Sequence, residues 1–236
     1  MKKIIIPLPD KDFDLTEVAV PWKMFKDKGY KITFATEKGK VAQTDPMLIT
    51  GVIFGQLGAK KEAIEIYREL EKAPEFLNPI TYAEIDVADF DAMHLPGGHA
   101  KGVKQYLESE VLQEKVAQFF EHNKIVGSIC HGALVLARAK DKKTGKSVVH
   151  NKKMTALIKI LEKAAYYITA WKLGDYYRTY PEYTQDEVKN VLDDKKQFVV
   201  GNPFVPMVVE DGNLVTARWP EDAVLYAEKL IEKLEN

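Results

Sequence analysis

The chain has 236 residues, of which 46% are hydrophobic, and a formal net charge of −1. This size and composition allow a full hydrophobic core, and we predict one domain over residues 1–236. The near-neutral charge without a basic stripe argues against nucleic acid as a partner. The apolar run Ile4–Ile6 is too short for a signal peptide or a membrane span, and a single cysteine suits a reducing compartment. We therefore expect a cytoplasmic protein without membrane contact.

In the first half of the chain, short apolar runs alternate with amphipathic segments, which is typical of βαβ units and a parallel sheet. From 39 to 85 glycines and prolines interrupt this pattern, and we interpret that segment as an insertion that contributes to a pocket wall. The elements expected in this half are strands at Lys3–Leu8 and Lys31–Thr36, and helices at Glu17–Lys28 and Lys60–Lys72.

In the second half, a strand is predicted at Asp91–Leu95, a helix at Val111–His122 and a strand over the apolar run Ile125–Ile129, before Cys130. An aromatic-rich insertion, 154–191, is long enough to form helices that pack across a pocket mouth or a subunit interface, or simply onto the domain. The turn dipeptide Asp211-Gly212 predicts a hairpin over Val208–Ala217, and a last helix is expected over Pro220–Leu234.

Cys130 is the strongest candidate for chemistry. It follows the apolar run Ile125–Ile129 and precedes the sequence His131-Gly132 and the helix-like stretch Ala133–Arg138. A strand that turns into a helix at a nucleophile is the nucleophile-elbow arrangement. A helix N-terminus favours the thiolate form, so we expect a lowered thiol pKa. The alternative is an inert core cysteine, because free cysteines are often buried.

Two glycines end the preceding strand, which should lie beside the strand of Cys130. Gly97 and Gly98 let backbone amides approach a ligand closely, so they are candidates for an oxyanion-binding turn together with the amide after Cys130. They are equally compatible with an ordinary tight turn. The five histidines, His94, His99, His122, His131 and His150, show no close metal-ligand spacing, so we predict no metal and no other cofactor.

Four segments of this chain together resemble the DJ-1/PfpI superfamily, and within it the Hsp31-like branch. They are Glu17-Val18-Ala19-Val20-Pro21, Leu95-Pro96-Gly97-Gly98-His99, Ser128-Ile129-Cys130-His131-Gly132 and Val215-Thr216-Ala217-Arg218-Trp219-Pro220. The resemblance implies a flavodoxin-like three-layer α/β sandwich with a mainly parallel sheet, a nucleophile elbow at Cys130 and helical insertions. It also implies a homodimer or a higher homo-oligomer.

The resemblance lends roles to individual residues. It implies that Cys130 is the nucleophile, that His131 stands beside it, and that Glu17 reaches the thiol from the first helix. A carboxylate close to a thiolate is a like-charge pair, so one of the two groups should hold a proton. Without the resemblance, an acid in a first helical turn is an ordinary partner of the helix dipole. His99 stands where Hsp31-like proteins also have histidine and is placed at the substrate site.

One departure from the branch concerns the acid that orients the histidine. The comparable stretch here, Thr155–Lys159, contains no acid, and Glu162 is the nearest substitute if the stretch is helical. Otherwise the site is a dyad of Cys130 and Glu17 with His131 held differently. Because an unoriented imidazole is a poor general base, this departure weakens a triad-type hydrolase more than an enzyme that adds a thiol to aldehydes.

The resemblance therefore implies a cofactor-free enzyme for small reactive carbonyls, with a glyoxalase III-like conversion of methylglyoxal to lactate or a related deglycase reaction, in stress protection. The alternatives from the same superfamily are a redox-sensing protein or a holdase chaperone, and a hydrolase or peptidase-like member. Turnover of an aldehyde would separate the enzyme from the sensor, in which Cys130 is oxidised instead.

Overall fold

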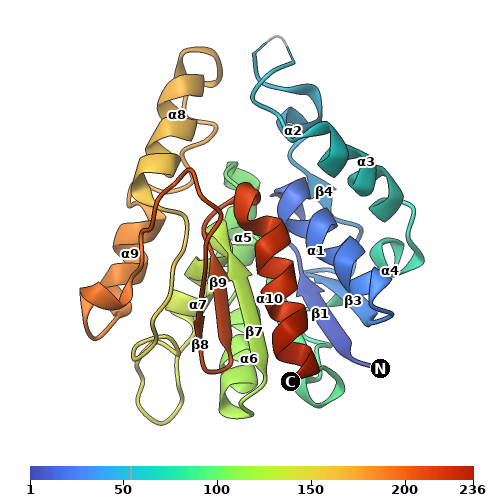
Figure 1. Cartoon of the computed structure of the whole chain (residues 1–236), viewed down its shortest axis with the longest axis vertical. Coiled ribbons are helices and arrows are strands. Elements are labelled where there is room, and N and C mark those ends of the chain that lie inside the picture. The colour runs from blue at the N-terminus through green and yellow to red at the C-terminus, as the bar shows by residue number, and fades with distance from the viewer. Residues whose placement is uncertain (54) are drawn as a thin grey trace.

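The computed structural model describes residues 1–53 and 55–236, and its centre is a seven-stranded sheet with helices on both faces (Figure 1). The strand order is β5-β3-β1-β6-β7-β9-β8, and all neighbouring strands are parallel except β8 and β9. The strands are β1 (Lys3–Pro7), β3 (Lys31–Thr36), β5 (Ile80–Thr81), β6 (Ala92–Leu95), β7 (Ile125–Ile129), β8 (Val208–Asp211) and β9 (Leu214–Ala217). Two further strands, β2 (Lys11–Phe13) and β4 (Gln43–Thr44), pair with each other beside this sheet.

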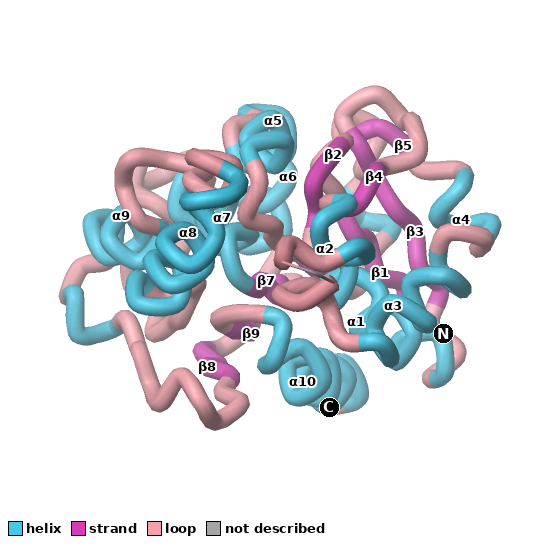
Figure 2. Tube along the Cα trace, turned by 90° about the horizontal axis from the view of Figure 1, so that it is seen from above, coloured by secondary structure: helices cyan, strands magenta, loops and turns pink. Residues whose placement is uncertain are grey.

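The helices cover the two faces of the sheet, and seen from above α10 lies on the opposite side from α5 and α6 (Figure 2). They are α1 (Leu15–Asp27), α2 (Pro46–Thr50), α3 (Lys61–Leu70), α4 (Pro74–Leu77), α5 (Lys104–Leu107), α6 (Glu110–Glu121), α7 (Ala133–Arg138), α8 (Lys159–Leu173), α9 (Thr184–Val191) and α10 (Ala223–Glu235). No helix within the two described ranges is long and apolar enough to cross a membrane.

The alternation of side chains along the strands divides the core in two. Ile4 and Ile6 of β1 pack with α1, α3 and α10, whereas Ile5 packs on the other face with α6 and α7. Successive residues of a strand point to opposite faces, so a strand that is apolar throughout must be covered on both sides. The predicted three-layer sandwich is confirmed.

The predicted elements agree closely with the observed ones. The strand Lys31–Thr36 has the predicted bounds, and the 154–191 insertion forms the two helices α8 and α9. The first helix begins at Leu15, two residues before its predicted start, because Asp14 caps it. The Asp14 side chain accepts hydrogen bonds from the amides of Thr16 and Glu17, which no intrahelical acceptor could satisfy. The short pair of β2 and β4 was not predicted.

The parallel strands direct several chain segments to one edge of the sheet. β6 ends before the Pro96–His99 turn, β7 ends at Ile129 before Cys130, and β9 ends before Arg218. In open α/β sheets, binding sites lie outside the carboxyl ends of the strands. The predicted neighbourhood of the Pro96–His99 turn and Cys130 follows from the direct pairing of β6 with β7.

Candidate active site

Cys130 stands at a sharp strand-to-helix turn. It follows β7 directly, has a left-handed backbone with φ of 58°, and begins a short 3-10 turn that leads into α7. A Cβ on Gly132 would lie 2.3 Å from the carbonyl oxygen of Leu95, so only glycine lets this turn pack against the end of β6. The thiol is fully buried. The local geometry is that of a nucleophile elbow.

Glu17 reaches Cys130 from the first turn of α1. Its Oε2 accepts a hydrogen bond of 2.8 Å from the amide of Gly97, and its Oε1 has no hydrogen-bond partner among the described residues. A Cβ on Gly97 would lie 3.0 Å from Cys130 Cβ and 3.1 Å from Glu17 Oε2, so glycine is required for the two side chains to meet here. The Gly97 amide therefore donates to Glu17 in this structure, and the oxyanion-binding role of this turn stays a prediction.

Burial sets the protonation of this pair. It raises the pKa of Glu17 well above 4.5, and the neighbouring Asp14 carboxylate adds to the rise. Burial also raises the pKa of the Cys130 thiol, and Glu17 and Asp14 raise it further, although the backbone amide of His131 acts in the opposite direction. The predicted lowering of the thiol pKa is wrong, because one amide does not compensate for lost hydration. Both shifts favour the protonated form of the group concerned.

His131 connects the thiol to a second acid. Its Nδ1 lies 3.6 Å from Cys130 Sγ, and its Nε2 lies 3.7 Å from Glu162 Oε1. Both side chains are buried, and Glu162 Oε2 also accepts a hydrogen bond of 2.9 Å from the amide of Thr184. Burial alone would raise the pKa of Glu162, but His131 and the Thr184 amide lower it below 4.5. An ionised Glu162 thus faces the imidazole.

His99 packs edge-on against His131, with ring centroids 4.9 Å apart. On its other side the ring of Tyr177 lies 6.2 Å away. Burial, helped by His131, lowers the pKa of His99 to about 3, so this ring is neutral. The potential ligand atoms of His99, Cys130 and His131 all lie within 4.8 Å of one another. Among the described residues, these three could together hold a metal ion. The sequence spacing gave no sign of this proximity.

The other predicted glycine and two unpredicted residues complete the surroundings of the pair. A Cβ on Gly98 would lie 2.3 Å from the carbonyl oxygen of Asp12, so Gly98 serves a close backbone approach. His94, on β6, lies under Glu17, with its Nε2 2.8 Å from the Glu17 carbonyl oxygen. Its Nδ1 lies 2.7 Å from the hydroxyl of Tyr226 on α10. Neither His94 nor Tyr226 carried a motif signal.

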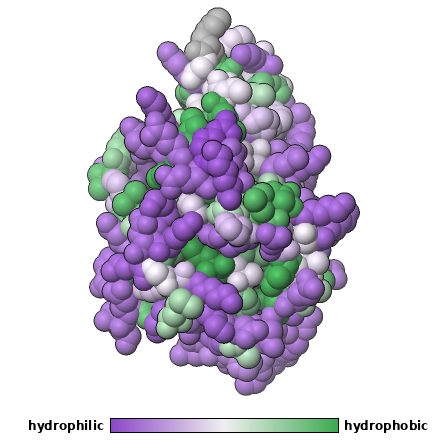
Figure 3. Space-filling view, turned by 90° about the vertical axis from the view of Figure 1, so that its right-hand side faces the viewer, coloured by the Kyte–Doolittle hydropathy of each residue, from purple (hydrophilic) through white to green (hydrophobic). Residues whose placement is uncertain are grey.

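A surface pocket of about 350 Å³ opens beside the start of α1. Asp14, Thr16 and Trp219 line it, together with residues of the 39–85 insertion such as Leu48 and Ala63. Figure 3 shows the side of the molecule that carries α3 and α4, where hydrophobic residues form separate patches among hydrophilic ones. Because Thr16 adjoins Glu17, the pocket reaches the residue next to the catalytic acid candidate.

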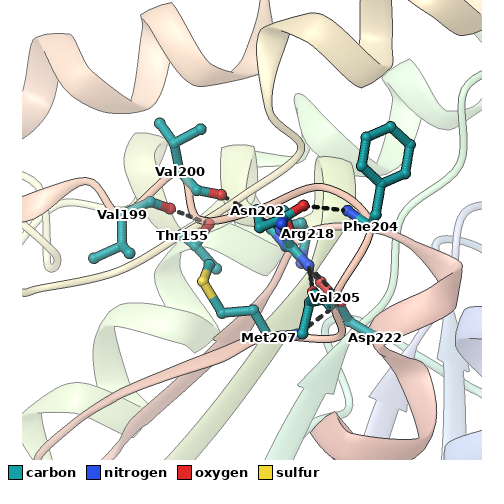
Figure 4. A network of polar contacts seen from close by, with 9 residues as sticks. All are labelled: Thr155, Val199, Val200, Asn202, Phe204, Val205, Met207, Arg218 and Asp222. Atoms are coloured by element: carbon teal, nitrogen blue, oxygen red, sulfur yellow. Dashed lines mark hydrogen bonds and ion pairs between the residues drawn. The ribbon is translucent and has the colours of Figure 1, made fainter.

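A second buried charged cluster follows β9, the strand that pairs with β7 (Figure 4). Arg218 follows β9 and is fully buried, as is its ion-pair partner Asp222, 2.8 Å away. Its guanidinium also donates to the carbonyl oxygens of Asn202 and Val205, at 2.8 and 2.6 Å. Asp222 Oδ1 accepts a further hydrogen bond from the amide of Met207. The cluster fixes the loop that precedes β8.

Comparison with known proteins places this arrangement in a family. The ThiJ/PfpI family-like pattern matches residues 8–201. The chain belongs to the ThiJ/PfpI family. Within the DJ-1/PfpI superfamily it falls in the Hsp31-like branch, as the sequence motifs predicted.

Several of the similar proteins come from yeasts. An uncharacterized protein of Schizosaccharomyces pombe is 31% identical over 145 residues, which are 58% of this chain and 54% of that protein. Glyoxalase 3 of Candida albicans is 25% identical and the glutathione-independent glyoxalase HSP31 of Saccharomyces cerevisiae 23% identical, each over 94% of this chain and 89% of the relative. The crystal structure of glyoxalase III from Candida albicans superposes with a TM-score of 0.74 at 23% identity, over 98% of this chain and 96% of that one. At the level of the family, the likeness is to glutathione-independent glyoxalases.

Proposed function

We propose that this protein is a cysteine-dependent, glutathione-independent glyoxalase that converts methylglyoxal to lactate. The observation that carries the proposal is the convergence of Cys130, Glu17 and the His131–Glu162 pair in one buried site. Similarity to glyoxalase 3 over 94% of the chain supports the same reaction class. A thiol nucleophile, a protonated acid and an imidazole beside a carboxylate are the groups that such a reaction needs.

The first step forms a hemithioacetal. His131 Nδ1, 3.6 Å from Sγ, accepts the thiol proton, and the ionised Glu162 beside Nε2 stabilises the resulting imidazolium. The thiolate then forms a C–S bond with the aldehyde carbon. Glu17, whose raised pKa favours the protonated acid, donates a proton to the aldehyde oxygen and becomes a carboxylate.

The next steps move hydrogen between the two oxidised carbons of the substrate. Glu17 removes the proton from the former aldehyde carbon while the His131 imidazolium protonates the ketone oxygen, which gives an enediol. Glu17 then returns its proton to the second carbon, and His131 takes the hydroxyl proton from the first. The product is a lactoyl thioester on Cys130, with no external oxidant or reductant.

Hydrolysis completes the cycle. Water adds its oxygen to the thioester carbon and gives one proton to Glu17, while the C–S bond breaks and the thiolate recovers a proton from His131. Lactic acid leaves and releases its proton to solvent as lactate, and the site returns to its resting protonation. Each catalytic group is thus used in both directions, and one water is consumed per turnover.

The structure bears on the alternatives raised from the sequence. A redox sensor needs a thiol of low pKa in the resting protein, whereas burial raises the pKa of the Cys130 thiol. A hydrolase gains support from Glu162, which lies where an orienting acid would act on His131. The experiment must therefore include an ester or peptide substrate beside the aldehyde.

The test is methylglyoxal consumption with detection of D- and L-lactate, on metal-stripped protein without glutathione. We expect lactate from the parent protein and none above background from Cys130→Ala. Cys130 is the only cysteine in the chain, so no other thiol can replace it. Lys142→Ala, which removes an exposed cation paired with Glu114, is the matched control and should keep full activity. A parent that forms no lactate but cleaves the ester would transfer the proposal to the hydrolase.

A further inference from the structure

The backbone carbonyl of Glu17 lacks its ordinary partner. In an α-helix the carbonyl of residue i accepts from the amide of residue i+4, and four residues after Glu17 stands Pro21, inside α1. Proline has no amide hydrogen, and its ring crowds the carbonyl of residue i−4. The helix therefore leaves the carbonyl of the catalytic acid candidate free at a buried position, where an unpaired carbonyl is costly.

His94 supplies the missing donor. Its Nε2 lies 2.8 Å from the Glu17 carbonyl oxygen, which can only accept, so Nε2 carries the hydrogen. The other nitrogen, Nδ1, is then an acceptor and receives the hydroxyl of Tyr226 at 2.7 Å. Burial lowers the pKa of His94 to about 4, which agrees with a neutral ring that has one N–H.

The sheet makes room for this pair at a specific glycine. Gly127 lies directly opposite His94 in the pairing of β6 and β7. A Cβ at Gly127 would lie 2.3 Å from the Tyr226 hydroxyl, so any side chain there would displace the tyrosine. Gly127 lies three residues before Cys130 on the strand that carries the nucleophile. The strand that carries Cys130 therefore also leaves the space in which Tyr226 contacts His94.

We propose that Pro21, His94 and Tyr226 are positioning residues for Glu17. Pro21 frees the Glu17 carbonyl, His94 binds it from β6, and Tyr226 fixes the tautomer and orientation of His94. Because the Asp14 side chain already holds the Glu17 amide, both backbone groups of Glu17 are fixed by side chains from outside its helical hydrogen bonds. The carboxyl is thereby held between the Gly97 amide and Cys130. The catalytic meaning of this unit rests on the function proposed above.

The first test removes and restores the donor. His94→Ala should lower kcat about 10- to 100-fold with little change in KM, because a small misplacement of a catalytic group costs about that much. His94→Gln, whose amide can donate from the place of Nε2, should recover most of the loss. Tyr82→Phe is the matched control, since Tyr82 is equally buried and its hydroxyl donates to the backbone of Leu8, away from Glu17.

A double-mutant cycle makes the test specific to the carbonyl. Pro21→Ala restores an amide four residues after Glu17, so the helix itself can satisfy the carbonyl. The loss caused by His94→Ala should then be several-fold smaller in the Pro21→Ala background than in the parent. Two effects that simply add, or a Tyr82→Phe variant that loses as much kcat as His94→Ala, would overturn the proposal.

A readout without substrate separates this inference from the proposed function. The ultraviolet absorbance of the thiolate follows the titration of Cys130, which Glu17 influences. We expect the thiol pKa to move in His94→Ala and to return in His94→Gln, and to stay at the parent value in Tyr82→Phe. That pattern in a protein without glyoxalase activity would defeat the proposed function and keep the positioning role. If His94→Ala does not fold, Tyr226→Phe replaces it in the comparison with His94→Gln, and an unshifted thiol pKa in Tyr226→Phe would overturn the proposal.

Discussion

Two buried charged clusters follow strands that pair with each other, and they differ in how completely their atoms are bonded. Cys130 comes directly after β7, and Arg218 comes directly after β9. Arg218 is held by Asp222 and by backbone carbonyls, and Asp222 accepts further hydrogen bonds from the backbone. Around Cys130, by contrast, Glu17 Oε1 and His131 Nε2 have no hydrogen-bond partner among the described residues.

The difference separates support from reactivity. A buried ion pair is tolerable only when its remaining hydrogen-bonding capacity is used, which the Arg218 cluster achieves. A group that must exchange protons with a substrate needs an atom that the protein leaves free. We therefore expect substitutions in the Arg218 cluster to lower stability, and substitutions around Cys130 to lower activity while leaving stability equal or higher.

The largest expected effect is that of Glu17→Gln. Activity should fall about 10³-fold or more, the range of a lost general acid and base. Stability should rise, because the pKa of Glu17 in the folded protein is raised above its unfolded value of about 4.5. The stability contributed by the bound proton is fully present below that value and is lost as pH rises through the folded pKa, whereas the amide cannot ionise.

Denaturant unfolding of the parent and Glu17→Gln at several pH values checks this prediction. The stability difference in favour of the variant should be small at pH 4 and grow toward pH 8. If Glu17→Gln instead becomes less stable than the parent with rising pH, Glu17 is ionised in the folded protein. The expected difference between the two clusters would then not hold for Glu17.

The next effect concerns the Arg218 cluster, in which the hydrogen-bonding groups are paired. Asp222→Ala leaves the Arg218 guanidinium buried without its anion, which typically costs about 3–5 kcal/mol of unfolding free energy. The measurement is again denaturant unfolding, with Glu235→Gln as the control, since Glu235 forms an exposed ion pair with Lys28. Exposed pairs contribute little. If Asp222→Ala loses no more unfolding free energy than Glu235→Gln, the Arg218 cluster does not support stability as we expect.

The smallest of the three effects is expected from Glu162→Gln. The amide keeps the shape and can still accept from Thr184, but it provides no negative charge for the imidazolium that forms on His131. We expect kcat to fall about 10- to 100-fold, within the usual range for support of a catalytic base. Steady-state kinetics alongside thermal unfolding tests this, and unchanged kcat would return the site to a dyad of Cys130 and Glu17.

The regular part of the fold was readable from the sequence because its signals are local. The strand Lys31–Thr36, the elbow at Cys130 and the hairpin around Asp211-Gly212 depend on runs of a few residues. Periodic apolar residues and turn glycines specify such elements without knowledge of the rest of the chain. Even the neighbourhood of Gly97 and Cys130 followed from parallel pairing.

The remainder of the site depends on contacts between distant segments. His99 and His131 meet only because β6 and β7 pair, and His94 lies against Glu17 through packing of α1 on the sheet. Tyr226 comes from the last helix, more than two hundred residues after Glu17, and no motif marks it. The thiol pKa was misjudged for a related reason, since burial is a property of the whole fold while the helix terminus is visible locally.

The left-handed backbone at Cys130, with φ of 58°, has a consequence for sequence change at this position. For a residue with a Cβ such a conformation costs roughly 1–3 kcal/mol, and glycine would adopt it without that strain. Every replacement that keeps a Cβ inherits the strained angle, and the one residue that relaxes it has no side chain with which to react. Position 130 can therefore have either an unstrained backbone or a nucleophilic side chain, but not both.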